Sequence, residues 1–209
     1  MAAHSAAWDS YLWEPGGSVL SNLFGLRDKA DLAKAEFAEA NAQQALVEEG
    51  LLSIPKTYDA AHLKALHKQL FGSIYEWAGE YRTVPIYKDQ FGFAELDDIP
   101  RYLEDAGRII EELDWSELDI DQFAAAAAEV FAYVNHAHPF REGNGRASKL
   151  FMQHVSELSR FEIDYDPATS GVTAAMWNEG SRFSGPDRFS YEPVPDSLVP
   201  VFRALAAER

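Results

Sequence analysis

Residues 138–149 read HPFREGNGRASK, and this stretch decides what the rest of the chain must build. A helical pattern runs up to about Asn135, and helical spacing of apolar residues resumes near Gly145. The stretch is therefore predicted to be a loop that closes onto the N-terminus of a helix. Such a terminus carries unpaired backbone N–H groups and the positive end of the helix dipole, and both favour an anion.

Glycine, asparagine and cationic side chains in this loop indicate a phosphate site. Gly143 and Gly145 allow backbone N–H groups to crowd round an anion, and Asn144 adds a side-chain amide donor. Arg146 and Lys149 stand three residues apart on the first helical turn. This spacing predicts that both cations can reach the same polyphosphate.

Other side chains of the loop add the chemistry of a transfer reaction. Glu142 is a hard oxygen ligand, and one carboxylate together with nucleotide oxygens is enough to hold Mg²⁺. His138 has an unperturbed pKa of about 6.5, which suits a general base at neutral pH. Phe140 is the apolar residue of the loop and is predicted to pin it to the core. Each feature alone is common in structural turns, but their combination without an insertion favours a functional site.

The loop resembles the signature of Fic domain proteins, His-x-Phe-x-Asp/Glu-Gly-Asn-Gly-Arg-x-x-Arg, at every fixed position except the last. The likeness continues upstream. Residues 11–28 (YLWEPGGSVLSNLFGLRD) look like the N-terminal arm of short bacterial Fic toxins. Residues 62–84 (HLKALHKQLFGSIYEWAGEYRTV) look like their central helix pair and the start of a flap. The resemblance implies an all-α Fic fold, a helical bundle with a small β-hairpin flap over the active site.

The resemblance also implies an activity and a role for each loop residue. The activity would be that of a protein adenylyltransferase, or AMPylator, which places AMP from ATP on a Ser, Thr or Tyr hydroxyl of a target protein. His138 would deprotonate the hydroxyl, and Glu142 would hold Mg²⁺ on the ATP phosphates. Gly143, Asn144 and Gly145 would form the anion hole. Arg146 would bind phosphate oxygens, so that the loop supplies both positioning and charge neutralisation.

Lys149 is the one departure from the signature. The resemblance implies that the arginine normally found there contacts the terminal phosphate of ATP and is also captured by an inhibitory glutamate. Lysine keeps the charge but loses the planar bidentate fork. Weaker binding of the γ-phosphate or weaker inhibition is therefore expected, and a tolerated variant is the plainer interpretation.

Residues 82–93 interrupt an otherwise helical pattern. The first part is rich in β-formers and residues 89–93 could turn it back, so a short hairpin is predicted. By resemblance, this hairpin would be a flap that aligns a target peptide by strand addition, and the alternative is an ordinary surface hairpin. The candidate target-binding residues of the flap are Thr83, Val84, Ile86, Tyr87 and Lys88.

Helical periodicity covers most of the remaining chain. Apolar stripes predict helices over about 28–49, 58–77, 99–113, 120–135 and 145–158, with shorter pieces near 173–178 and 197–207. Asp59 is a plausible N-cap, Gly72 is expected to kink or divide its segment, and Asp119 with Gln122 resembles a capping box. The predicted organisation is an N-terminal arm, residues 1–27, on a Fic domain, residues 28–209.

Composition narrows the class of protein. The chain has 209 residues, 47% of them hydrophobic, which predicts one folded domain with a sizeable core. It has no cysteine, so disulfides, thiolate metal sites and cysteine nucleophiles are excluded. The net charge of −16 opposes direct binding to nucleic acid. The sequence shows neither an apolar run of the ~20 residues that span a membrane nor a signal-peptide pattern, so a cytoplasmic protein is expected.

Regulation is partly visible in the sequence. By resemblance, many Fic enzymes are restrained by a helix bearing Ser/Thr-x-x-x-Glu-Gly/Asn, whose glutamate blocks the γ-phosphate site. This chain has no such pattern, because Pro15 follows the candidate at Ser10 and Glu14, and Ala45 stands where Glu49 would need a hydroxyl partner. We therefore hypothesise that a small separate antitoxin supplies the inhibitory helix and that this chain is the toxin of the pair.

Two alternatives stay open beside AMP transfer. The first is another reaction on the same fold, a phosphotransferase or other nucleotidyl-type transferase, although the intact Gly-Asn-Gly-Arg run favours AMP. The second is a catalytically degenerate Fic domain that serves as a binding module, against which the intact His138 and Glu142 argue. By resemblance alone, DNA topoisomerase subunits are candidate targets.

Overall fold

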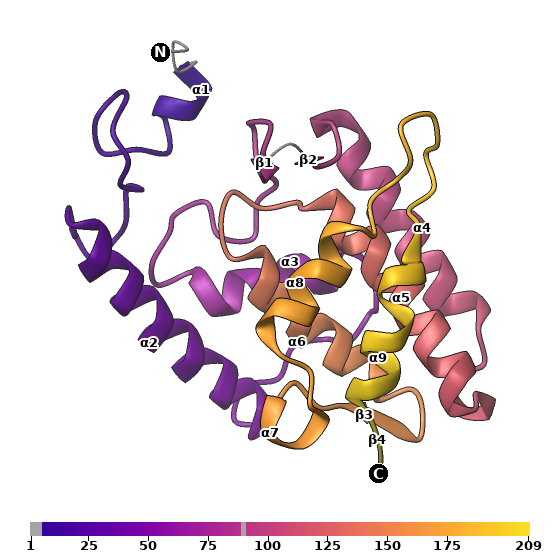
Figure 1. Ribbon diagram of the computed structural model, residues 1–209. Helices are drawn as coiled ribbons and strands as arrows, with labels where there is room; N and C mark the ends of the chain where they lie inside the picture. Colours follow the sequence, from indigo (N-terminus) through magenta and orange to yellow (C-terminus); the bar gives the residue numbers. More distant parts are fainter. Residues whose placement is uncertain (1–5, 89–90) are drawn as a thin grey trace.

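The computed structural model describes residues 6–88 and 91–209, and helices dominate it (Figure 1). The long helices are α2 (Lys29–Glu48), α3 (Ala60–Phe71), α4 (Ile99–Glu112), α5 (Ile120–Ala137) and α6 (Asn144–Ser156). The shorter ones are α1 (Ala6–Asp9), α7 (Pro167–Ser170), α8 (Ala174–Arg182) and α9 (Val199–Leu205). Short 3₁₀ turns are η1 (Leu96–Asp98), η2 (Trp115–Glu117) and η3 (Pro195–Ser197). The prediction of a helical bundle is confirmed.

Local capping explains where the helices that carry the site begin. The Asp59 side chain accepts a hydrogen bond from the backbone N–H of His62 and caps α3, as predicted. Asp119 and Gln122 form a complete capping box at the start of α5. The predicted helix 58–77 is shorter in the structure, because α3 stops at Phe71 with Gly72 as its C-cap.

Helix α5 is the centre of the bundle and packs against α4, α6 and α9 (Figure 1). Four of the five alanines in the run 124–128 are buried. Small side chains let the neighbouring helices approach closely, so the C-terminal end of α5 is held in a fixed place. That end leads directly into the loop 138–143.

The sequence did not predict a second small sheet. Strands β3 (Phe161–Ile163) and β4 (Ala206–Glu208) pair antiparallel, with Phe161 opposite Glu208. The predicted helix 197–207 therefore ends early, and its last residues form a strand. Three-residue strands carry too little alternation to be recognised, and here tertiary pairing overrides the helical preference of alanine.

The N-terminal segment, in the part that the structure describes, packs against the body through Tyr11 and Trp13. The Tyr11 ring is buried and meets Trp77 edge to face at 5.7 Å. The Trp13 indole N–H donates to the carbonyl of Leu26 at 2.7 Å. The arm of residues 1–27 as a separate unit stays a prediction.

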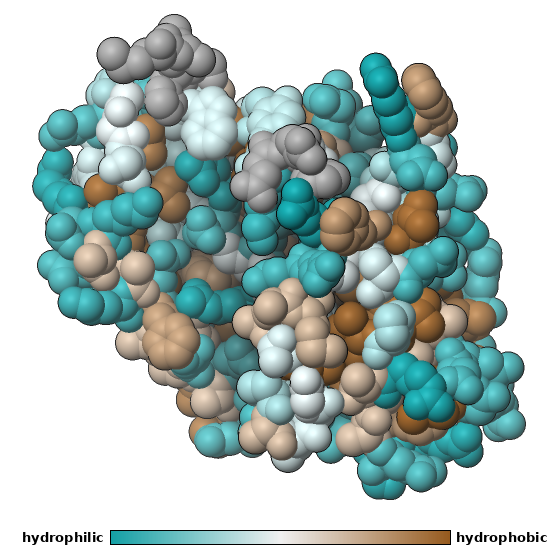
Figure 2. All heavy atoms as spheres, in the orientation of Figure 1, coloured by the Kyte–Doolittle hydropathy of each residue, from teal (hydrophilic) through white to brown (hydrophobic). Residues whose placement is uncertain are grey.

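Hydrophilic side chains dominate the face seen in Figure 2, and apolar ones gather mainly around α8 and α9. This surface agrees with the strongly acidic composition. Among the described residues, none of the helices has the length and apolar character needed to cross a bilayer.

Candidate active site

The loop that follows α5 begins with a left-handed residue. His138 is the C-cap of α5, with φ 40° and ψ 58°, and its N–H donates to the carbonyl of Val134 at 3.2 Å. A non-glycine residue in this region is strained, and such strain persists only when surrounding contacts enforce it. Gly143, at φ 82°, ends the loop as the N-cap of α6. The loop therefore joins two buried helices and ends at a helix N-terminus, as predicted.

Asn144 closes the loop on itself. The N–H of Phe140 donates to Asn144 Oδ1 at 2.8 Å, and Asn144 Nδ2 donates to the Phe140 carbonyl at 2.7 Å. The side-chain amide was expected to face an anion, and instead both its ends hold the loop backbone. The backbone N–H groups of the first turn of α6 remain as the donors that a helix offers an anion.

The two glycines of the motif face different surroundings. A Cβ atom on Gly143 would lie 2.4 Å from the Phe71 ring, so that position accepts only glycine on steric and conformational grounds. A Cβ atom on Gly145 would meet nothing within 4 Å. Gly143 therefore lets the loop press against α3, whereas Gly145 keeps open space at the start of α6.

Arg82 joins the loop to the hairpin from inside the protein. This side chain is only 3% exposed, and its Nε donates to the carbonyl of His138 at 2.8 Å. Its Nη atoms donate to the carbonyls of Val84 and Ala94 at 2.9 and 2.5 Å. In the sequence Arg82 is only the first residue of a β-rich segment, because nothing there marks an arginine as buried.

The ring of His138 is held between the hairpin and α5. Phe93 stacks on it with ring centroids 3.6 Å apart and an angle of 13° between the planes. Burial, together with the positive charge of Arg82, lowers the pKa of His138 to about 3. A hydrogen bond to the backbone of Asn135 acts in the opposite direction. The ring is therefore neutral at pH 7.

The predicted hairpin is present, but it is shorter than residues 82–93. Strands β1 (Tyr87–Lys88) and β2 (Phe91–Gly92) pair antiparallel, and the N–H of Phe93 donates to the carbonyl of Ile86. The turn predicted at residues 89–90 lies outside the described residues. Thr83 and Val84, which were also predicted to bind the target, lie at the base of the hairpin. Val84 is fully buried, and the Thr83 N–H donates to the Tyr11 hydroxyl.

One cleft of about 1010 Å³ brings these parts together. The hairpin, the loop and α8 all line it, so three segments that are distant in the sequence form the walls of this cleft. The residues most relevant to chemistry on its wall are Ile86, Tyr87, Lys88, Phe93, His138, Glu142, Asn144, Gly145 and Trp177.

The two predicted phosphate-binding cations point to different neighbours. The Arg146 guanidinium lies 5.8 Å from the Phe37 ring centre and 5.9 Å from that of Phe71. The Lys149 ammonium lies 4.9 Å from the ring centres of both Tyr165 and Trp177, and burial lowers the pKa of Lys149. The two cations thus rest against different rings, and their binding of one polyphosphate stays a prediction.

Glu142 is exposed at the cleft, and its Oε1 accepts a hydrogen bond from the N–H of Gly143 at 3.1 Å. The described residues contain no group of three or more His, Cys, Asp or Glu that could hold a metal ion. A lone carboxylate fits Mg²⁺, which keeps several waters and takes much of its shell from nucleotide phosphates.

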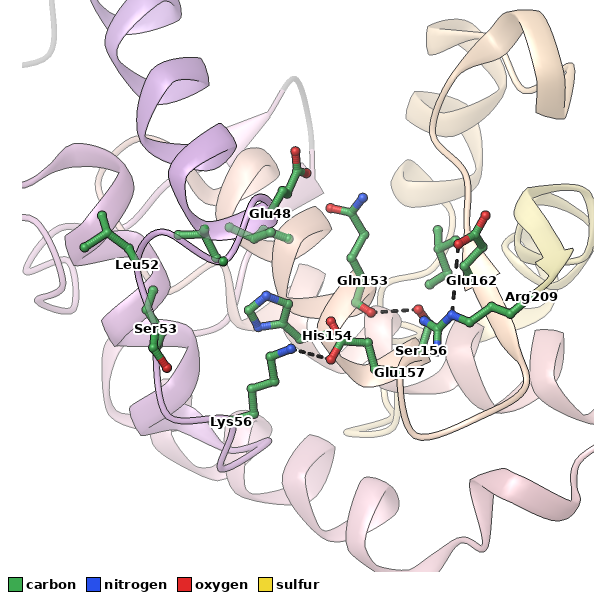
Figure 3. Close-up of a pocket in the computed structure, with 15 residues that line it drawn as sticks. Glu48, Leu52, Ser53, Lys56, Gln153, His154, Ser156, Glu157, Glu162 and Arg209 are labelled. Atoms are coloured by element: carbon green, nitrogen blue, oxygen red, sulfur yellow. Dashed lines mark hydrogen bonds and ion pairs between the residues drawn. The ribbon is translucent and has the colours of Figure 1, made fainter.

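A second cavity, of about 450 Å³, lies at the C-terminal end of α6 (Figure 3). Four of its charged side chains form ion pairs, Lys56 with Glu157 and Arg209 with Glu162. None of the predicted site residues lines it. The cleft at the other end of α6 is therefore the candidate active site.

A buried histidine pair lies beside this second cavity. His62 Nε2 and His154 Nδ1 are 2.9 Å apart, and His62 Nδ1 accepts the backbone N–H of Tyr58. Burial is the main cause that lowers the pKa of His62 to about 4, and the neighbouring His154 acts in the same direction. Both rings are therefore neutral at pH 7, with His62 donating to His154.

Residues 57–156 match the sequence pattern of the Fic/DOC family. The chain is 36% identical over 170 residues to protein adenylyltransferase VbhT of Bartonella schoenbuchensis. This match covers 79% of the chain but only about a third, 34%, of the length of VbhT. It is 31% identical over 172 residues to probable protein adenylyltransferase y4lH of Sinorhizobium fredii, covering 78% and 83% of the two chains. The N-terminal Fic domain of a VirB-translocated Bep effector protein from Bartonella quintana, with bound ADP, has a similar structure. The TM-score is 0.78 at 26% sequence identity, over 96% of this chain and 95% of that one.

The steric difference between the two glycines gives a matched pair of variants. We expect Gly143→Ala to lower the free energy of unfolding by about 1–3 kcal/mol, because it adds strain at positive φ and a clash with Phe71. Gly145→Ala should leave stability unchanged or raise it slightly, since alanine favours a helix. Urea unfolding measures both, and equal losses in the two variants would contradict the assignment.

The buried histidines predict an acid-sensitive fold. The pKa of each of the five histidines in the described residues is lowered. In the unfolded chain they titrate near ~6.5, so below this pH the unfolded state binds more protons. The free energy of unfolding should therefore fall as the pH drops from about 6.5 towards 4. Urea unfolding between pH 7.5 and 5 tests this. His62→Gln should reduce the slope of the free energy of unfolding against pH, and an unchanged slope in that variant would reject the contribution of His62.

Proposed function

The chain belongs to the Fic/DOC family, and from this we infer that it is a protein adenylyltransferase, which transfers AMP from ATP to a hydroxyl group of a target protein. One observation carries the proposal. His138, the exposed Glu142 and the N-terminus of α6 face one cleft beside an exposed hairpin. That arrangement offers a base, a carboxylate for a metal ion and an anion site within reach of one substrate.

His138 is the proposed general base. Its hydrogen bond to the Asn135 backbone occupies one ring nitrogen, so the other nitrogen of the neutral ring can accept a proton. That nitrogen takes the proton of the target hydroxyl as the hydroxyl oxygen bonds to the α-phosphorus of ATP. The bond from this phosphorus to the bridging oxygen breaks, and pyrophosphate leaves with the electron pair.

The anion site is proposed to neutralise the charge that develops on the transferred phosphate. The first N–H groups of α6 have no partner within the helix, and Asn144 and Gly143 hold them in place. Arg146 adds positive charge on the same turn. Glu142 would hold Mg²⁺, which would supply positive charge next to the phosphates.

The hairpin is proposed to align the target. Its described edge presents Ile86, Tyr87 and Lys88 to the cleft, and Tyr87 is 66% exposed. A peptide that pairs with this edge would bring its hydroxyl towards His138, while Thr83 and Val84 anchor the base of the flap. The target is a protein with an accessible Ser, Thr or Tyr. DNA topoisomerase subunits are the first candidates, through resemblance alone.

We further propose that this chain is the toxin of a toxin–antitoxin pair that acts in the cytoplasm, where ATP is supplied. The sequence lacks the inhibitory Ser/Thr-x-x-x-Glu-Gly/Asn pattern, so a small partner protein would bring the inhibitory glutamate. Co-purification with a short helical protein encoded beside it, and loss of transfer in that complex, would support this pairing.

Transfer of label from α-labelled ATP to protein tests the proposed activity. With Mg²⁺ and a bacterial lysate, the native chain should label a protein band, and His138→Ala should label it at least ~100-fold more slowly, because the proton acceptor is lost. His154→Gln, at the far end of α6, is the matched control and should keep the activity. A mass increment other than that of AMP would point to another transferase reaction. Equal labelling by His138→Ala would reject the base.

The low pKa of His138 predicts an unusual pH profile. The pKa of about 3 keeps the ring neutral down to pH values far below the usual range of histidine. The value of kcat/KM should therefore stay nearly constant from pH 8 to about 5.5, as long as circular dichroism shows a folded protein. A tenfold fall per pH unit below about 6.5 would contradict this environment for His138.

A further inference from the structure

His67 of α3 is a second buried side chain that contacts the loop, at a residue other than the one Arg82 binds. Its side chain is fully buried, and its Nε2 lies 2.8 Å from the carbonyl oxygen of Glu142. Its Nδ1 lies 2.8 Å from the backbone nitrogen of Gly79. Its ring stacks on Phe140, with centroids 3.7 Å apart and 17° between the planes.

The partners of His67 fix its tautomer. The backbone N–H of Gly79 can only donate, so Nδ1 must be the acceptor. Nε2 then carries the hydrogen and donates to the Glu142 carbonyl. An imidazolium has no acceptor nitrogen, so the hydrogen bond from Gly79 requires the neutral ring.

This hydrogen bond sets the orientation of a whole peptide plane. In a trans peptide the C=O and the following N–H point in opposite directions. When His67 holds the Glu142 carbonyl towards α3, the N–H of Gly143 points away from α3. That N–H donates to Glu142 Oε1 at 3.1 Å. The 142–143 peptide thus connects the two side chains, because its C=O accepts from His67 and its N–H donates to the Glu142 carboxylate.

We infer that His67 is a positioning residue, whose Nε2–H orients the 142–143 peptide and through it the carboxylate of Glu142 towards the nucleotide phosphates. The inference rests on the proposed function for the role of Glu142 in holding Mg²⁺. Phe71 of α3 occupies the space where a Cβ atom on Gly143 would lie, 2.4 Å away, so the loop is closely packed against α3 at this peptide.

Two substitutions separate the hydrogen bond from the ring. His67→Phe keeps an aromatic ring on Phe140 but has no N–H for the Glu142 carbonyl. His67→Gln loses the stacking and keeps an amide that can donate to that carbonyl and accept from Gly79. Binding of AMPPNP is measured by calorimetry with and without Mg²⁺, on protein shown to be folded by circular dichroism.

The inference predicts that His67→Phe weakens Mg²⁺-dependent binding of AMPPNP by about 10-fold or more, the usual effect of losing a group that orients a metal ligand. Binding without Mg²⁺ should change by less than about threefold, and His67→Gln should stay within about threefold of the native chain in both conditions. Equal weakening with and without Mg²⁺, or native affinity in His67→Phe, would overturn the inference.

A second measurement needs no nucleotide. Amide exchange followed by NMR should show the Gly143 N–H protected in the native chain and in His67→Gln, and exchanging at least ~10-fold faster in His67→Phe. Equal exchange in all three proteins would overturn the inference. A native chain that binds AMPPNP with Mg²⁺ but labels no protein would reject the proposed transfer reaction while leaving the test of His67 intact.

Discussion

The buried guanidinium of Arg82 is the constraint on which the site depends. It donates to backbone carbonyls from both sides of the hairpin, at Val84 and Ala94, and to those of Ala137 and His138 at the end of α5. A buried cation without hydrogen bonds would be strongly destabilising, so these carbonyls and the guanidinium require one another. The base of the flap and the proposed catalytic histidine consequently form one rigid unit, and the strained backbone of His138 is enforced by this network.

The other side of the loop is held by a different kind of interaction. Arg82 uses a charge, whereas His67 is neutral and uses one N–H together with a flat ring against Phe140. Asn144 then closes the loop internally. With the loop held by His67 of α3, by Arg82 of the segment before the hairpin and by its own Asn144, the amides of α6 and the Glu142 carboxylate are placed before any substrate binds. Such preorganisation is what electrostatic stabilisation of a transition state requires, since little reorganisation remains to be done.

Much of this site could be predicted from the sequence, and the misses have physical causes. The loop, its helix N-terminus and the capping residues Asp59 and Asp119 follow from short-range rules that act within a few residues. The roles of Arg82 and His67 depend on contacts with residues more than fifty positions away, which no local pattern records. The sequence shows that Asn144 has an amide donor, and an anion was therefore predicted as its partner. The sequence does not show that the Phe140 carbonyl takes this hydrogen bond instead.

An acidic chain that handles a polyphosphate must create a local positive field, and the positions of the cations suggest how. The net charge is −16, Lys149 lies against the rings of Tyr165 and Trp177, and Arg146 lies over Phe37. Among the described residues, neither Arg146 nor Lys149 forms an ion pair with a carboxylate. The fixed part of the field therefore comes from backbone amides at the start of α6, which cannot move away or be screened as exposed charges are. Because backbone amides bind an anion only when they point at it, the proposed phosphate site depends on a rigid loop.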